Sequence, residues 1–190
     1  MKKIIPIWIS NRHVHLSIDD ASILFWSGYE FQKIKDLSQP GQFACAETIS
    51  IKWPKGQIDG VRVLGSYRKE TQVEILQADN FKLGTQAPIR LSWDLADSGA
   101  IELIGPKGSV QLTQGLIVAQ RHLHATPADA QRLGVEDGQV ISVAVWGMRA
   151  TLFGATIVRV TETSALDMHI DVEEWNAAGL GMWAEGEIID

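Results

Sequence analysis

The feature that most constrains the fold is a histidine motif that occurs twice. Residues 11–16 are Asn-Arg-His-Val-His-Leu, and residues 120–125 are Gln-Arg-His-Leu-His-Ala. Each copy is followed by a helix-start pattern, with Ser17 and Asp20 after the first and Thr126 and Asp129 after the second. A hydroxyl residue with an acid three positions later is typical of a helix N-terminus. The repeated unit of strand, His-X-His and helix therefore predicts two related halves.

The motif also suggests metal binding. In an extended strand, residues i and i+2 face the same side, so His-X-His presents two imidazoles together, as a metal ion requires. One such pair is equally well explained by two hydrogen-bonded imidazoles on a half-buried strand. Two copies in matching context favour a metal. The fifth histidine, His169, lies outside both copies and can complete one of the two sites.

The rest of the chain is expected to be mainly β. Short segments rich in β-branched residues, separated by glycine and other turn formers, predict strands, and the apolar residues before the first motif predict another. These segments are residues 61–64, 71–76, 101–104, 110–112, 116–119, 140–145, 151–153 and 156–160. Such spacing favours barrels or sandwiches. Helices are expected at residues 17–26, 127–133 and 172–178, the last two ending at glycine.

Composition limits the classes of function. The 190 residues are 45% hydrophobic, enough for one large domain or two small ones. A net charge of -6 gives no support for nucleic-acid binding. No apolar run is long enough to span a membrane, so no membrane partner is expected. The single cysteine, Cys45, excludes an internal disulfide and favours a cytoplasmic location.

Motifs along nearly the whole chain resemble the PduL-type phosphate propanoyltransferases, the phosphotransacylase family associated with bacterial microcompartments. The resemblance depends on the order and spacing of several stretches together. They are residues 11–17, 39–44, 61–65, 68–74, 104–110, 119–124, 169–171 and 176–180.

The resemblance implies two β-barrel domains capped by short α-helices, with the active site at their interface. The first barrel would be discontinuous, comprising residues 1–11 and 120–190, and the second would comprise residues 12–119. It also implies two zinc ions per chain, with cobalt as an alternative. By motif position, the ligands of one ion would be His13, His15 and Glu74, and those of the other His122, His124 and His169. From its position alone, at the end of an alternating strand, Glu74 would be read as a solvent-facing acid.

The same resemblance assigns the substrate contacts. Arg68 would bind phosphate as the catalytic arginine. Coenzyme A would contact Ser10, Lys35, Arg62, Leu64, His169 and Asn176. The implied reaction transfers a propanoyl or acetyl group between coenzyme A and inorganic phosphate, and a homodimer stays open as the assembly. The residue types suit this chemistry, because zinc polarises a carbonyl and the guanidinium fork binds two phosphate oxygens. Direct attack by phosphate requires no acyl-enzyme.

Two other functions stay open. A zinc-bound water could support a hydrolase acting on thioesters or phosphoesters, although a phosphate-binding arginine is not needed for thioester hydrolysis. A non-catalytic zinc-binding module is the second alternative. Structural zinc sites use four protein ligands each, and five histidines with one acid do not complete two such sites.

Several residues leave more than one role open. Arg12 and Arg121 can pair with carboxylates or steer anions, and Asp171 can orient a ligand imidazole or cap the following helix. The chain also departs from the family. Ser66 replaces a usual proline, Trp93 replaces a usual glycine, and residues 172–175 are Val-Glu-Glu-Trp in place of Thr-Asp-Glu-Ala.

The bulk of Trp93 and Trp175 is expected to narrow the range of acyl chains accepted. Only twelve residues precede His13. The sequence therefore shows no microcompartment-targeting extension of the kind some relatives carry, which favours a free cytoplasmic enzyme.

Overall fold

The computed structural model describes residues 2–189, which form two compact units. Unit 1 contains residues 2–10, Ser38–Pro40 and residues 120–189, and unit 2 contains Asn11–Leu37 and Gly41–Ala119. The ranges expected from sequence differ from these at residue 11 and at Ser38–Pro40. This short segment belongs to unit 1, where the Gln39 side-chain amide donates to the Ala165 carbonyl, 2.9 Å away.

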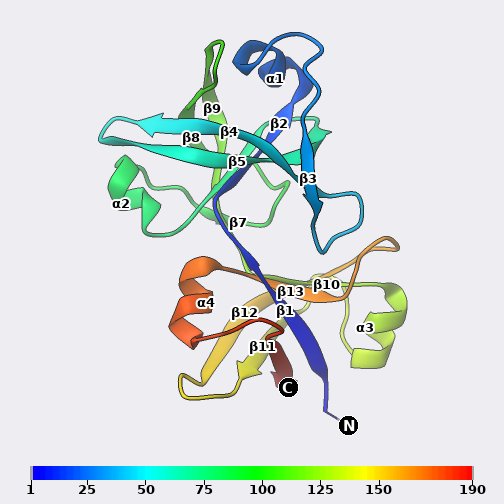
Figure 1. Cartoon of the computed structure of the whole chain (residues 1–190). Helices are drawn as coiled ribbons and strands as arrows, with labels where there is room; N and C mark the ends of the chain where they lie inside the picture. The colour runs from blue at the N-terminus through cyan, green and yellow to red at the C-terminus, as the bar shows by residue number, and fades with distance from the viewer. Residues whose placement is uncertain (1, 190) are drawn as a thin grey trace. The chain divides into compact units, whose positions relative to one another are not determined.

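Unit 1 is a closed barrel of six strands (Figure 1). In barrel order these are β1 (Ile4–Ser10), β13 (Asp167–Asp171), β10 (His122–Ala125), β12 (Thr151–Val160), β11 (Val140–Val145) and β14 (Glu185–Ile189). The β1–β13 and β10–β12 pairs are parallel and the other neighbours are antiparallel. Helix α3 (Pro127–Leu133) follows β10, and helix α4 (Val172–Ala178) follows β13. Ile5, Leu123 and Met168 are fully buried inside the barrel.

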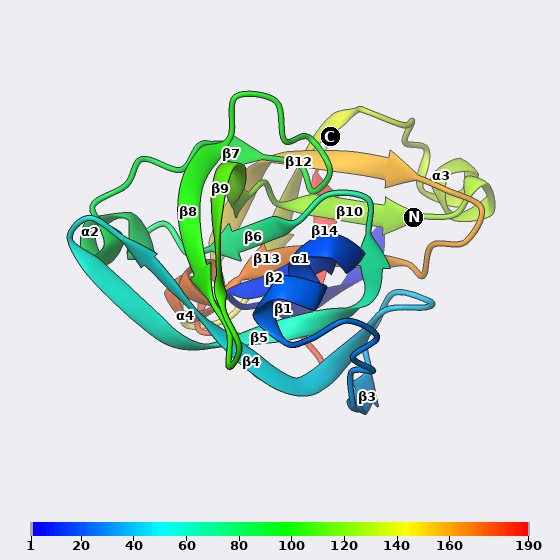
Figure 2. The same ribbon diagram turned by 90° about the horizontal axis from the view of Figure 1, so that it is seen from above.

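Unit 2 contains a second six-stranded barrel (Figure 2). Its strands are β4 (Phe43–Trp53), β5 (Gly56–Arg68), β2 (His13–Ser17), β6 (Gln72–Ile75), β9 (Ser109–Ala119) and β8 (Gly99–Ile104), and β8 pairs with β4 to close the ring. Two short strands, β3 (Lys33–Asp36) and β7 (Ile89–Arg90), extend it. Helices α1 (Ile18–Leu24) and α2 (Asp79–Leu83) complete the unit. The prediction of a mainly β fold with two barrels and short helices is confirmed.

The two barrels share one pattern of strand order and direction. β2 lies between parallel β5 and antiparallel β6, just as β10 lies between parallel β12 and antiparallel β13. In the same way, β9 pairs parallel with β6 and β1 pairs parallel with β13. The repeat seen in the sequence is therefore a repeat of whole barrels.

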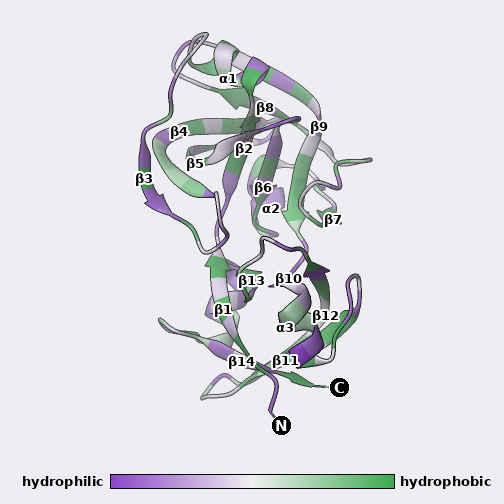
Figure 3. Cartoon of the chain, turned by 90° about the vertical axis from the view of Figure 1, so that its right-hand side faces the viewer, coloured by the Kyte–Doolittle hydropathy of each residue, from purple (hydrophilic) through white to green (hydrophobic). Residues whose placement is uncertain are grey.

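The strand that precedes each histidine motif belongs to the barrel that does not contain that motif. β1 is part of unit 1 but leads directly into β2 of unit 2, and β9 is part of unit 2 but leads into β10 of unit 1. Along β9, hydrophilic residues give way to a hydrophobic stretch whose Leu116 and Ile117 are fully buried (Figure 3). Each unit thus contains one strand that leads directly into the histidine motif of the other unit.

Side-chain caps lie at the N-termini of three of the four helices within residues 2–189. Ser17 accepts a hydrogen bond from the Asp20 amide, and Thr126 forms a capping box with Asp129. Asp171 forms a capping box with Glu174, so of its two expected roles the structure shows the helix cap. No helix within residues 2–189 is long and apolar enough to cross a membrane.

Candidate active site

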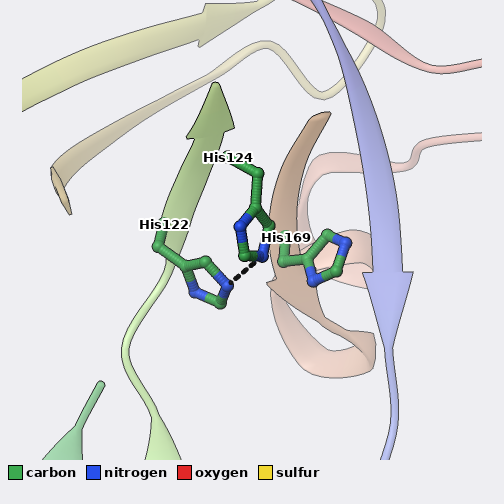
Figure 4. A group of neighbouring side chains, drawn as sticks. All are labelled: His122, His124 and His169. Carbon is green, nitrogen blue, oxygen red and sulfur yellow. Dashed lines mark hydrogen bonds between the residues drawn. The ribbon is translucent and has the colours of Figure 1, made fainter. Parts of the chain in front are cut away.

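Three imidazoles converge in unit 1. His122 and His124 come from β10, and His169 comes from the adjacent strand β13, directly opposite His122 in the register. One ring nitrogen from each lies within 4.8 Å of the other two, and the rings turn toward one another (Figure 4). Among the described residues this is the one group of three ligand side chains so close together. The cluster can hold a metal ion, as expected for this triplet.

Hydrogen bonding determines which nitrogen of His122 faces the cluster. His122 Nδ1 lies 2.8 Å from the Gln120 carbonyl oxygen, which only accepts, so Nδ1 carries the hydrogen. The Nε2 atom therefore presents its lone pair to the centre of the cluster. A second contact fixing the ring in this way is the usual arrangement for a histidine that binds metal.

Burial and neighbouring rings also affect the charge of His124. Burial, and then the nearby His122 and His169, lower the pKa of His124 to about 3. His124 is therefore neutral near pH 7, the form that binds metal.

Residues that the sequence analysis missed surround His169. Its Nε2 atom lies 3.2 Å from Asp167 Oδ1 and 3.1 Å from Ser38 Oγ. Burial opposes ionisation of Asp167, but hydrogen bonding and charge from His169, with a hydrogen bond from Ser38, lower its pKa. Gln39 donates to the same carboxylate oxygen over 2.8 Å. The only sequence sign of Asp167 was its position two residues before His169, on the same face of one strand.

Unit 2 contains the other histidine pair. His13 Nδ1 lies 2.7 Å from the Asn11 carbonyl oxygen, which repeats the contact of His122 and leaves Nε2 as the acceptor. That Nε2 lies 3.5 Å from Glu74 Oε2. Glu74 is only 6% exposed, so it is not the solvent-facing acid that its strand position alone allowed. Its other oxygen accepts hydrogen bonds from Gln72, at 2.7 Å, and Ser92, at 2.6 Å.

His15 differs from its counterpart His124. Its Nε2 atom lies 3.2 Å from Arg68 Nη2, and its Nδ1 is buried without a hydrogen bond of normal geometry. Burial, followed by His13 and Arg68, holds the pKa of His15 well below its usual value. Arg68 therefore lies against the imidazole pair, where an anion held by its guanidinium would be beside the histidines. Within the described residues, His13, His15 and Glu74 do not converge as tightly as the unit 1 triplet.

The residues expected to contact coenzyme A divide evenly between the units. Ser10, His169 and Asn176 lie in unit 1, where Ser10 pairs with Asp171 across β1 and β13 and Asn176 is exposed on α4. In unit 2, Arg62 and Leu64 lie opposite His13 and His15 in the register, and Lys35 is exposed on β3. The Arg62 guanidinium donates to the carbonyls of Cys45 and Ala46.

The arginines before each His-X-His pair with acids at the starts of helices. Arg12 forms two bonds with Asp79, with Nε 2.8 Å from Oδ2 and Nη2 3.0 Å from Oδ1. Arg121 Nε lies 2.8 Å from Glu174 Oε1. Of the two roles considered for these arginines, the structure shows carboxylate pairing. It is a further feature that the two barrels share.

The two six-stranded barrels, one of them with a histidine cluster that can hold a metal ion, define the class as a two-barrel β protein with a candidate metal site. Residues 6–181 match the family model described as phosphate propanoyltransferase. The chain is 50% identical to the phosphate propanoyltransferase of Rhodobacter capsulatus, covering 93% of this chain and 82% of that protein. Identity is 48% with the Thermotoga maritima protein of that name, covering 93% and 84% respectively. With the Listeria monocytogenes protein it is 45%, covering 97% and 87%. The chain therefore belongs to the phosphate propanoyltransferase family, a family of acyltransferase enzymes.

Proposed function

We propose that this protein transfers a propanoyl or acetyl group between coenzyme A and inorganic phosphate, with a metal ion bound in each unit. The observation that carries the proposal is the convergence of His122, His124 and His169 in a chain of this family. Zinc fits neutral imidazoles, and cobalt is the alternative. The unit 1 ion would bind these three histidines, and the unit 2 ion would bind His13, His15 and Glu74.

A bound zinc ion would supply Lewis acidity to the thioester carbonyl or to the departing sulfur. The protein side chains do the rest. Three protein ligands leave a coordination position open, unlike a closed structural site. The Nδ1 contacts of His13 and His122 hold both rings with Nε2 available for binding. Asp167 and Ser38 orient His169.

Arg68 is proposed to hold the phosphate. A guanidinium stays charged at any working pH, and its planar fork binds two phosphate oxygens at once. Because Arg68 contacts His15, the phosphate would be held beside the unit 2 histidines. A phosphate oxygen then attacks the thioester carbonyl carbon, the carbon–sulfur bond breaks, and coenzyme A leaves as the thiolate. The products are the acyl phosphate and free coenzyme A.

No acyl-enzyme is required by this scheme, and Cys45 is unsuited to forming one. The Cys45 side chain is fully buried. Burial raises the pKa of its thiol to about 11, so the nucleophilic thiolate is scarce near pH 7. Direct attack by phosphate is thus the simplest route. Coenzyme A is proposed to contact Ser10, Lys35, Arg62, Leu64, His169 and Asn176.

A phosphate-dependence assay tests the proposal. Zinc-loaded protein is mixed with propanoyl-CoA or acetyl-CoA with and without phosphate, while thiol release and acyl phosphate formation are followed together. We expect both products in equal amounts and only with phosphate. Thiol release that proceeds equally without phosphate would instead support a hydrolase. Metal analysis of the same sample should find two ions per chain, and a metal-loaded sample inactive in both assays would support a non-catalytic module.

A further inference from the structure

Trp93 covers one face of the arginine proposed to bind phosphate. The Arg68 guanidinium carbon lies 3.3 Å from the centroid of the Trp93 ring, a face-on cation–π contact. Arg68 Nη2 also lies 3.2 Å from His15 Nε2. The planar guanidinium thus has a ring against its face and an imidazole at its edge. Together these contacts limit how the plane of the guanidinium can turn.

The backbone of Trp93 is strained. Its φ angle is +85°, in the left-handed region that a bulky residue rarely adopts. The Trp93 amide donates to the Gln72 side-chain oxygen over 2.7 Å, and Gln72 in turn donates to Glu74. Ser92 donates to the same Glu74 oxygen. The strained residue is therefore tied to a proposed metal ligand.

Burial does not explain why a large ring occupies this position. Trp93 is 55% exposed, and it lies outside the apolar core formed by the described residues of unit 2. More than half of Trp93 stays in contact with water, so much of the apolar surface of the ring does nothing to offset the backbone strain. The interaction that calls for an aromatic ring at this position is the contact with the Arg68 guanidinium.

We infer that Trp93 is a positioning residue for Arg68, holding the guanidinium with its edge presented to phosphate; this rests on the proposed function. A long flexible arginine loses side-chain freedom when it binds an anion. Stacking on Trp93 restricts that freedom beforehand, so phosphate binds more tightly. The N–H groups of a guanidinium point outward in its plane, so stacking on one face does not block the edge, where two N–H groups can bind two oxygens.

Three variants at this position separate the inference from its rivals. Trp93→Leu keeps bulk but removes the aromatic face, Trp93→Phe keeps an aromatic face, and Trp93→Gly removes the side chain while relieving the positive φ. We expect the Leu and Gly variants to raise KM for phosphate by roughly three- to tenfold. Their kcat and KM for propanoyl-CoA should stay within about twofold. Trp93→Phe should retain most of the phosphate affinity.

A double-mutant cycle tests whether Trp93 acts through Arg68. In an Arg68→Ala background, Trp93→Leu should raise KM for phosphate no further. An equal additional rise in that background would overturn the inference. So would an unchanged phosphate KM in both Trp93→Leu and Trp93→Gly. A changed acyl chain-length preference with unchanged phosphate KM would show instead that Trp93 only narrows the acyl pocket.

The Gly variant guards against misfolding as an explanation. Glycine adopts φ of +85° without strain, so Trp93→Gly can keep the backbone conformation of this position. The proposed function is judged separately, by whether the parent protein needs phosphate for thiol release. If that need were absent, calorimetric titration of the parent and of Trp93→Leu with inorganic phosphate still decides the inference. Equal affinities would overturn it, and weaker binding by the variant would support it.

Discussion

His122 Nε2 and His124 Nε2 face each other across 3.0 Å, and in the neutral pair only one of them carries a hydrogen. The Gln120 carbonyl oxygen accepts a hydrogen bond from His122 Nδ1, so the hydrogen of His122 is on Nδ1. His122 Nε2 is therefore the acceptor, and His124 Nε2 is the donor. A cation between the rings would replace this single hydrogen bond with bonds to both lone pairs. The pair is thus arranged as a ligand set in which one proton occupies the place of the metal.

His124→Ala should therefore abolish one metal site and leave the other. We expect bound zinc, measured by elemental analysis after dialysis, to fall by about one ion per chain, with kcat reduced by about a hundredfold or more. Gln131→Ala, at an exposed position on the adjacent helix α3, is the matched control and should keep both ions. A His124→Ala protein that retains full metal content and turnover would remove this residue from the site.

Arg68→Ala should weaken the use of phosphate while leaving metal content unchanged. Loss of a charge-assisted, two-oxygen contact is expected to raise KM for phosphate by about thirtyfold or more. Arg68→Lys keeps the charge but not the planar fork, so its KM should fall between those of the parent and the Ala variant. Initial-rate kinetics at saturating propanoyl-CoA give these values. A normal phosphate KM for Arg68→Ala would place the anion elsewhere.

The sequence was most informative about features that depend on residues close together in the chain. The spacing of His13 and His15, and of His122 and His124, already predicted paired imidazoles on strands, because period two is a local property of the backbone. The bounds of helix α3 were also predicted correctly, because Thr126 and Gly134, which cap its two ends, are local signals in the sequence. Helix α2 was missed because Ala78, at its start, offers no side-chain cap.

Features that depend on distant partners could not be predicted. Gly115 suggested that residues 110–112 and 116–119 were separate strands, yet pairing with β8 and β6 makes β9 continuous. Residues 151–153 and 156–160 were likewise expected as separate strands. They form the single strand β12, which continues through Ala155 although the φ angle of that residue is +51°. Ser38 and Gln39 are far from His169 and Asp167 in sequence, so their contacts exist only once unit 1 has folded.

Acid should destabilise the metal-free protein partly through His124. Its pKa is about 3 when folded and about 6.5 when unfolded. Above pH 6.5 the ring is neutral in both states and contributes no pH dependence. As pH falls from about 6.5 toward 3, the unfolded state takes up a proton that the folded state does not, so the free energy of unfolding decreases. Urea unfolding in EDTA across this range should show the decrease.

His124→Gln provides the comparison for this pH effect, because glutamine does not titrate. Its stability should fall less steeply between pH 6.5 and pH 4 than that of the parent. Identical slopes for the two proteins would show that His124 is protonated equally in the folded and unfolded states. Adding zinc to the parent should steepen the dependence, since protons compete with the metal for all the ligand imidazoles.

The Arg12–Asp79 pair should matter more for stability than an exposed ion pair. Asp79 is buried, and its carboxylate also accepts a hydrogen bond from the Leu76 amide. Arg12→Ala would leave this buried charge without its cation, at a cost of about 1–3 kcal/mol in unfolding free energy. Lys2→Ala, which removes the exposed end of the Lys2–Glu187 pair, should cost less than about 1 kcal/mol.

Urea unfolding in EDTA measures the stability cost of each variant without a contribution from metal binding at His13, the neighbour of Arg12. Equal costs for Arg12→Ala and Lys2→Ala would contradict the prediction. Asp79→Asn in the Arg12→Ala background should recover part of the loss, because an uncharged amide is less costly to bury than an unpaired carboxylate.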